Sequence, residues 1–132
     1  MPMILRISIL VFVLATAISG CNGPLVRDIP LLYGKGETLL GEGIRQFEEA
    51  NYRAAGGAIQ RALQAGLTFA SEVKAHKYLA FIYCINGRKA QCRDEFRETV
   101  KLDPKFDLKP EEAGHPMWGP VFREVKTDAA RG

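Results

Sequence analysis

Residues 73–106 decide the fold, and they read VKAHKYLAFIYCINGRKAQCRDEFRETVKLDPKF. Asn86-Gly87 divides this block, and Asp103-Pro104 closes it. Glycine ends a helix at little cost because it adopts the left-handed conformation, and a residue that precedes proline disfavours helix. The block therefore predicts two antiparallel helices, over about residues 70–86 and 89–102.

The same block matches a repeat of 34 residues. Counted from Val73, the informative positions are Leu79 at 7, Ala80 at 8, Tyr83 at 11, Cys92 at 20, Phe96 at 24, Thr99 at 27 and Pro104 at 32. This order resembles the tetratricopeptide repeat, with Cys92 and Thr99 in place of two alanines. Small residues at positions 8 and 20 let the two helices approach closely. The resemblance implies an all-α fold built of helix hairpins.

A weaker copy of the repeat lies upstream and begins at Gly36. It supplies small residues at Gly43, Ala55 and Ala62, but it lacks the aromatic residue and the proline of the second copy. It predicts helices over about 37–50 and 53–65, so that residues 37–108 form a domain of two tetratricopeptide-type hairpins. Residues 21–36 carry several Gly and Pro residues and are predicted to be a tether, with the first helix beginning near Glu37.

Residues 109–132 are predicted to cap the second hairpin, because a repeat array must cover its outer face. Residues 111–120 are rich in turn formers, and residues 121–125 read as a short helix. The apolar face of this segment is expected to pack on the second helix of the second hairpin. It consists of Trp118, Val121, Phe122 and Val125.

Residues 1–20 have the layout of a secretory signal peptide: a short basic start, an apolar stretch and then small residues. The sequence Ile18-Ser19-Gly20-Cys21 resembles the lipobox of bacterial lipoproteins. This resemblance implies lipidation of Cys21 and a stable anchor of two or three acyl chains. Together with Asn22, it favours the periplasmic face of the outer membrane. An ordinary signal peptide and an uncleaved anchor are the alternatives.

Residues 74–125 resemble the TssQ-type accessory lipoproteins of type VI secretion systems. The resemblance rests on residues 75–84, 91–96 and 114–122. It implies a scaffold or adaptor that binds protein partners of a secretion or envelope complex and contacts the membrane through its lipid anchor. An assembly factor of another envelope system, such as a pilus, and an activator of a cell-wall enzyme are alternative functions.

Cys84 and Cys92 stand on either side of the turn in the second hairpin, where antiparallel helices bring such positions together. They are candidates for a disulfide bond in an oxidising compartment. Two buried thiols are the alternative. The spacing of these residues does not suggest a metal site.

The first helix of the second hairpin offers a candidate protein-binding surface, since tetratricopeptide arrays commonly bind peptides along such helices. Its residues are Lys74, Lys77, Tyr78, Phe81 and Ile85. The lysines beside aromatic side chains suit an acidic peptide. Alternatively, the apolar members fill the gap between the first helices of the two hairpins.

Other classes of function find little support in the sequence. The net charge is +3 without a clustered basic face, which argues against a nucleic-acid partner. The two histidines, His76 and His115, are expected to play structural roles. No catalytic or phosphate-binding motif is present. We therefore expect no enzyme activity, no cofactor, no metal and no small-molecule substrate.

Overall fold

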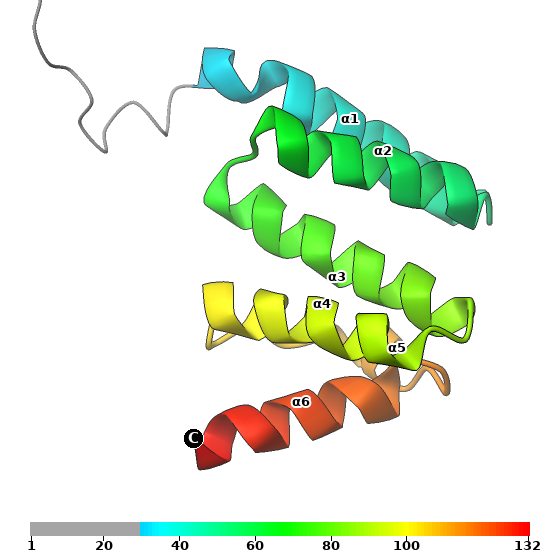
Figure 1. Ribbon diagram of the computed structural model, residues 1–132, viewed down its shortest axis with the longest axis vertical. Coiled ribbons are helices and arrows are strands. Elements are labelled where there is room, and N and C mark those ends of the chain that lie inside the picture. Colours follow the sequence, from blue (N-terminus) through cyan, green and yellow to red (C-terminus); the bar gives the residue numbers. More distant parts are fainter. Residues whose placement is uncertain (1–29) are drawn as a thin grey trace, which may run out of the picture.

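The computed structural model describes residues 30–132, with side chains from Gly34 onward. Within this part of the chain there are two helix hairpins, α1 with α2 and α3 with α4, followed by a helix α6 that packs on α4 (Figure 1). The helices are α1 (Pro30–Glu48), α2 (Tyr52–Ala65), α3 (Phe69–Ile85), α4 (Lys89–Leu102), α5 (Pro110–Ala113) and α6 (Gly119–Arg131). The fold is all-α, with two tetratricopeptide-type hairpins and a C-terminal capping helix, as predicted. The predicted signal peptide and Cys21 lie outside the described residues.

The start of α1 corrects one prediction. The helix begins at Pro30 rather than near Glu37, so residues 30–36 are helical and do not belong to a tether. Proline is favoured at the first helical position, where its missing N–H has no partner to lose. Gly36 serves packing, because a Cβ there would overlap the carbonyl oxygen of Gly66 at the end of α2.

Small residues bring the helices of each hairpin together, as the repeat pattern predicted. A Cβ on Gly43 of α1 would lie 3.2 Å from the carbonyl oxygen of Ala55 in α2. In the second hairpin, Ala80 of α3 and Cys92 of α4 are fully buried. The predicted helix ends are also confirmed, because Asn86 and a left-handed Gly87 follow α3, and α4 ends before Asp103.

The tail packs on the second hairpin, as the sequence predicted. Val121, Phe122 and Val125 of α6 are buried in the core of this hairpin, and the rings of Phe122 and Phe96 lie 5.1 Å apart. The helix is longer than predicted, since it continues to Arg131. The short helix α5 was not predicted. It begins one residue before the turn-rich segment 111–120 and occupies the start of that segment.

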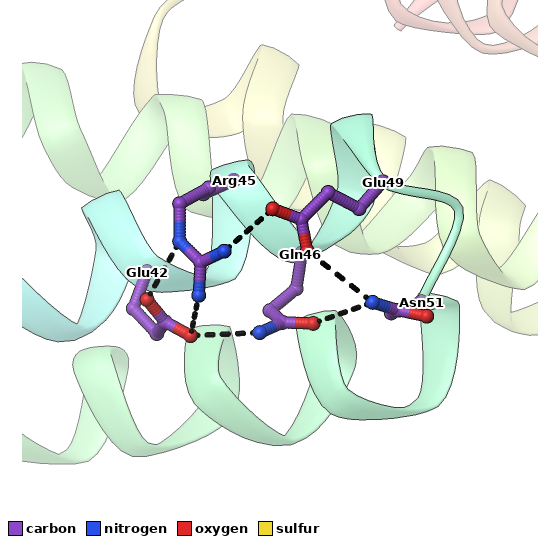
Figure 2. Close-up of polar contacts among 5 residues, drawn as sticks. All are labelled: Glu42, Arg45, Gln46, Glu49 and Asn51. Atoms are coloured by element: carbon purple, nitrogen blue, oxygen red, sulfur yellow. Dashed lines mark hydrogen bonds and ion pairs between the residues drawn. The ribbon is translucent and has the colours of Figure 1, made fainter.

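The turn between α1 and α2 is held by a polar network (Figure 2). Arg45 contacts the carboxylates of Glu42 and Glu49, and the side-chain amide of Asn51 donates to Gln46 at 2.9 Å. Ala50 takes a positive φ of 61° to make the turn. The network is exposed, so it positions the start of α2 more than it stabilises the fold.

None of the helices in residues 30–132 is both long enough and apolar enough to cross a bilayer.

Candidate protein-binding surfaces

Two residues of the predicted binding surface on α3 are covered by the tail of the same chain. Lys77 is 8% exposed, and its Nζ lies 2.6 Å from Oε1 of Glu112 in α5. Phe81 is 2% exposed and stacks on Trp118, with 4.2 Å between the ring centroids. Trp118 is itself fixed, because its Nε1 donates to the carbonyl oxygen of Glu112 at 2.8 Å. The prediction that Lys77 and Phe81 face a partner is therefore wrong, since the tail already fills that space.

The other three residues of that surface differ in exposure. Tyr78 is half-buried against Phe47 of α1, with ring centroids 5.2 Å apart. Burial, followed by the nearby carboxylates of Glu112 and Glu48, raises the pKa of the Tyr78 phenol. Ile85 is partly buried and packs against the core of the second hairpin, while Lys74 is exposed. The alternative interpretation was that the apolar residues fill the gap between α1 and α3. It describes Tyr78 and Phe81 better than the binding of a partner does.

The histidines make contacts within the fold. Nδ1 of His76 lies 2.6 Å from Glu95 and links α3 to α4. His115 accepts a hydrogen bond from the backbone N–H of Met117 at 3.2 Å, and its ring stacks on Trp118. Both residues hold neighbouring segments in place.

Cys84 and Cys92 form a disulfide bond, with Cα atoms 5.2 Å apart. The bond joins the last turn of α3 to the first turn of α4, and both residues are buried. Because the two cysteines have a sequence separation of 8, the bond restricts the turn that carries Asn86 and Arg88. That turn borders the groove described next.

A groove of about 390 Å³ opens between α2 and α3. The two helices are joined by residues 66–68 and diverge away from that loop (Figure 1), and the groove lies toward their far end. Its lining comprises Tyr52, Arg53, Gly56, Gly57, Gln60, Leu79, Ile82, Tyr83, Asn86 and Arg88. The side-chain amide of Gln60 donates to the Tyr83 hydroxyl at 3.1 Å and connects the two walls.

Two adjacent glycines form part of the α2 wall. A Cβ on Gly56 would meet only Ile82, at an ordinary contact distance of 3.8 Å, and neither Gly56 nor Gly57 has a positive φ. Each glycine inside a helix costs about 0.8–1 kcal/mol relative to alanine. Packing and backbone conformation within the described chain do not require this glycine pair. The missing side chains leave the groove wall open, so that another chain can approach α2 closely.

Positive charge lines the same groove. Arg53 and Arg88 are exposed, and neither forms an ion pair with a carboxylate of residues 34–132. The carboxylates of Glu42 and Glu49, toward the end of α1, are engaged by Arg45 (Figure 2). The groove therefore combines small residues, tyrosines and cations that have no charged partner in this part of the chain.

Sequence reasoning missed this groove because its walls come from different hairpins. The signal available was the pair Gly56-Gly57 in a predicted helix, where a turn is not needed. Around the groove and elsewhere in residues 34–132, no cluster of His, Cys, Asp and Glu could hold a metal ion. No family model, curated protein or solved structure matches the chain.

Proposed function

We propose that the protein is a membrane-tethered adaptor and that the α2–α3 groove receives a segment of a protein partner. The observation that carries the proposal is the open wall at Gly56 and Gly57. These glycines weaken α2, and packing within the described chain does not require them. Close approach of a partner backbone is a common reason for glycine at such a position. Arg53 and Arg88 would attract carboxylates of that partner, while Tyr52 and Tyr83 offer amphipathic contact area.

The cellular setting of the proposal comes from the sequence. The lipobox-like residues 18–21 support lipidation of Cys21, and Asn22 after them supports a position at the periplasmic face of the outer membrane. The resemblance to TssQ-type lipoproteins supports a type VI secretion-type envelope machine as the source of partners. A binding groove on a tethered helical domain suits a scaffold that holds such a machine at the membrane.

Filling the groove tests the proposed surface. Gly56→Leu places a side chain in the groove and raises helix propensity. Gly41→Leu is the matched control, because Gly41 is an exposed residue of α1 and a Cβ added there would meet no atom within 4 Å. Affinity purification from envelope fractions, with mass spectrometry, should recover secretion-system membrane subunits with the control and the natural protein. Gly56→Leu should recover several-fold less.

The outcomes separate the parts of the proposal. Equal recovery with both variants would show that the groove is not the binding surface. Recovery of a different envelope complex would remove the assignment to a secretion machine and retain the adaptor.

The anchor is tested separately with Cys21→Ala, which should move the protein from the membrane fraction to the soluble fraction. A protein that stays in the membrane would contradict lipidation at Cys21.

A further inference from the structure

Helix α4 carries a row of cations along one face. They are spaced four residues apart: Lys89, Arg93, Arg97 and Lys101. Residues four apart lie one above another on a helix surface, so the row forms a stripe along the whole of α4. Arg93 is partly exposed, and the other three are exposed. In the sequence this row is hidden among acidic residues, and two of these, Asp94 and Glu98, pair with Arg97 and Lys101 on the exposed surface of the helix.

Helix α6 extends the positive charge across a groove. A hollow of about 670 Å³ between α4 and α6 is lined by Arg93, Arg97, Pro120, Arg123, Glu124, Thr127, Asp128 and Arg131. Four of these residues are arginines and two are acidic. Glu124 is already paired with Arg93 at 2.8 Å, and that hydrogen bond, followed by the charge of Lys89, lowers its pKa. Arg97 is likewise paired with Asp94 at 3.1 Å, so the positive excess of the groove comes from Arg123 and Arg131, which outnumber Asp128.

The groove continues into an apolar section. A second hollow, of about 400 Å³, shares Arg97 and Asp128 with the first. Its remaining lining is Val100, Lys101, Pro104, Val125 and Ala129. The basic row and the apolar residues thus run side by side between α4 and α6, at the end of the stack of helices opposite α1 (Figure 1).

We infer that the α4–α6 groove binds an acidic amphipathic helix of a protein partner. Carboxylates four residues apart on such a helix would match the spacing of the α4 row, and its apolar face would cover Pro104 and Ala129, the exposed apolar residues of the second hollow. The exposed apolar side chains of Pro104 and Ala129 beside the cations can be covered by the apolar face of a helix but not by a row of nucleic-acid phosphates, which makes a protein helix the better fit. This surface is separate from the α2–α3 groove, so the inference goes beyond the proposed function.

A designed peptide tests the inference directly. The probe is a synthetic helical peptide as long as α4, with glutamates four residues apart on one face and leucines on the neighbouring face. Binding to the full chain in mild detergent is followed by fluorescence anisotropy. The variant Arg97→Glu/Arg123→Glu should weaken the dissociation constant by about tenfold or more, and added salt should weaken binding to the natural protein.

Two further variants make the result specific. Arg97→Lys/Arg123→Lys keeps the charges and should bind within a few-fold of the natural protein. Lys35→Glu/Arg61→Glu makes the same change in net charge on exposed positions of α1 and α2, and it should leave binding unchanged. Circular dichroism of each variant should show unchanged helix content. A control that loses binding as much as the α4–α6 variant would overturn the inference.

Competing occupants predict other results. Vesicles of phosphatidylglycerol and phosphatidylcholine that bind the chain through Arg97 and Arg123 more tightly than the acidic peptide would identify a lipid surface instead. Sedimentation that shows a dimer lost on Arg97→Glu/Arg123→Glu would identify a second copy of this chain. Either result would overturn the inference of an acidic partner helix.

Discussion

Nζ of Lys77 in α3 lies 2.6 Å from Oε1 of Glu112 in α5, and the two side chains are only 10% and 16% exposed. The lysine predicted to receive an acidic partner thus binds a carboxylate of its own chain. Trp118 lies beside this pair, stacks on Phe81 and is hydrogen-bonded to the backbone of Glu112. These contacts make the C-terminal segment part of the second hairpin's core.

Breaking the pair from one side should destabilise the protein. Glu112→Gln leaves the Lys77 ammonium mostly buried without a counter-charge, and we expect a loss of about 3 kcal/mol in the free energy of unfolding. The double variant Lys77→Met/Glu112→Leu should lose less than about 1 kcal/mol, because neither charge remains. Urea unfolding followed by circular dichroism measures both. As a control, Lys101→Ala removes an exposed pair with Glu98 and should cost less than about 0.5 kcal/mol.

Removing the disulfide should also lower stability. Cys84→Ala/Cys92→Ala frees a loop with a sequence separation of 8, and the chain-entropy model predicts a loss of about 2–3 kcal/mol. Thermal unfolding of the natural protein with and without a reducing agent should reproduce this loss, and the variant should not respond to the reductant. An equal response of both proteins would contradict a bond between these residues.

Glu37 should give the protein a pH-dependent stability. Burial raises the pKa of this carboxyl, but hydrogen bonds from Ser71 and Thr68 outweigh burial and lower it below 4.5. A lowered folded-state pKa stabilises the fold above the unfolded pKa, and that contribution is lost as the pH falls through the folded value.

The variant Glu37→Gln should therefore cost about 1 kcal/mol at neutral pH, because it weakens the hydrogen bonds that join α1 to the start of α3. The difference from the natural protein should shrink below pH 4.5. Unfolding by urea over a series of pH values measures this difference in the free energy of unfolding. A difference that stays constant down to acid pH would show that the Glu37 charge does not contribute.

Three glycines should respond differently to alanine. Gly56→Ala should stabilise the protein by about 0.5–1 kcal/mol, since its Cβ meets only Ile82 at 3.8 Å. Gly36→Ala should destabilise it by at least about 1–3 kcal/mol, because the new Cβ would overlap the Gly66 backbone. Gly43→Ala should destabilise it as well, through contact with Ile59. Melting temperatures rank the three variants, and a destabilising Gly56→Ala would remove the main support for the proposed groove.

Local patterns predicted most of the helix ends correctly. Asn86-Gly87 and Asp103-Pro104 act through the conformations of their own backbone, so their effect can be read without a partner. The exception was the start of α1, where Gly34 and Gly36 suggested a tether. Gly36 is needed because α2 returns to the same place, and a pattern confined to one segment does not report that contact.

The sequence by itself determined the hairpins and the apolar face of the tail, because helix periodicity and small residues at fixed spacing are local properties of the chain. Only the tertiary structure decided which surfaces are open. It buried Lys77 and Phe81 under α5 and Trp118, opened the groove between α2 and α3, and set the cations of α4 beside those of α6. Exposure depends on which distant segment packs on a face, and residues 77 and 112 become neighbours only when the whole tail has folded back.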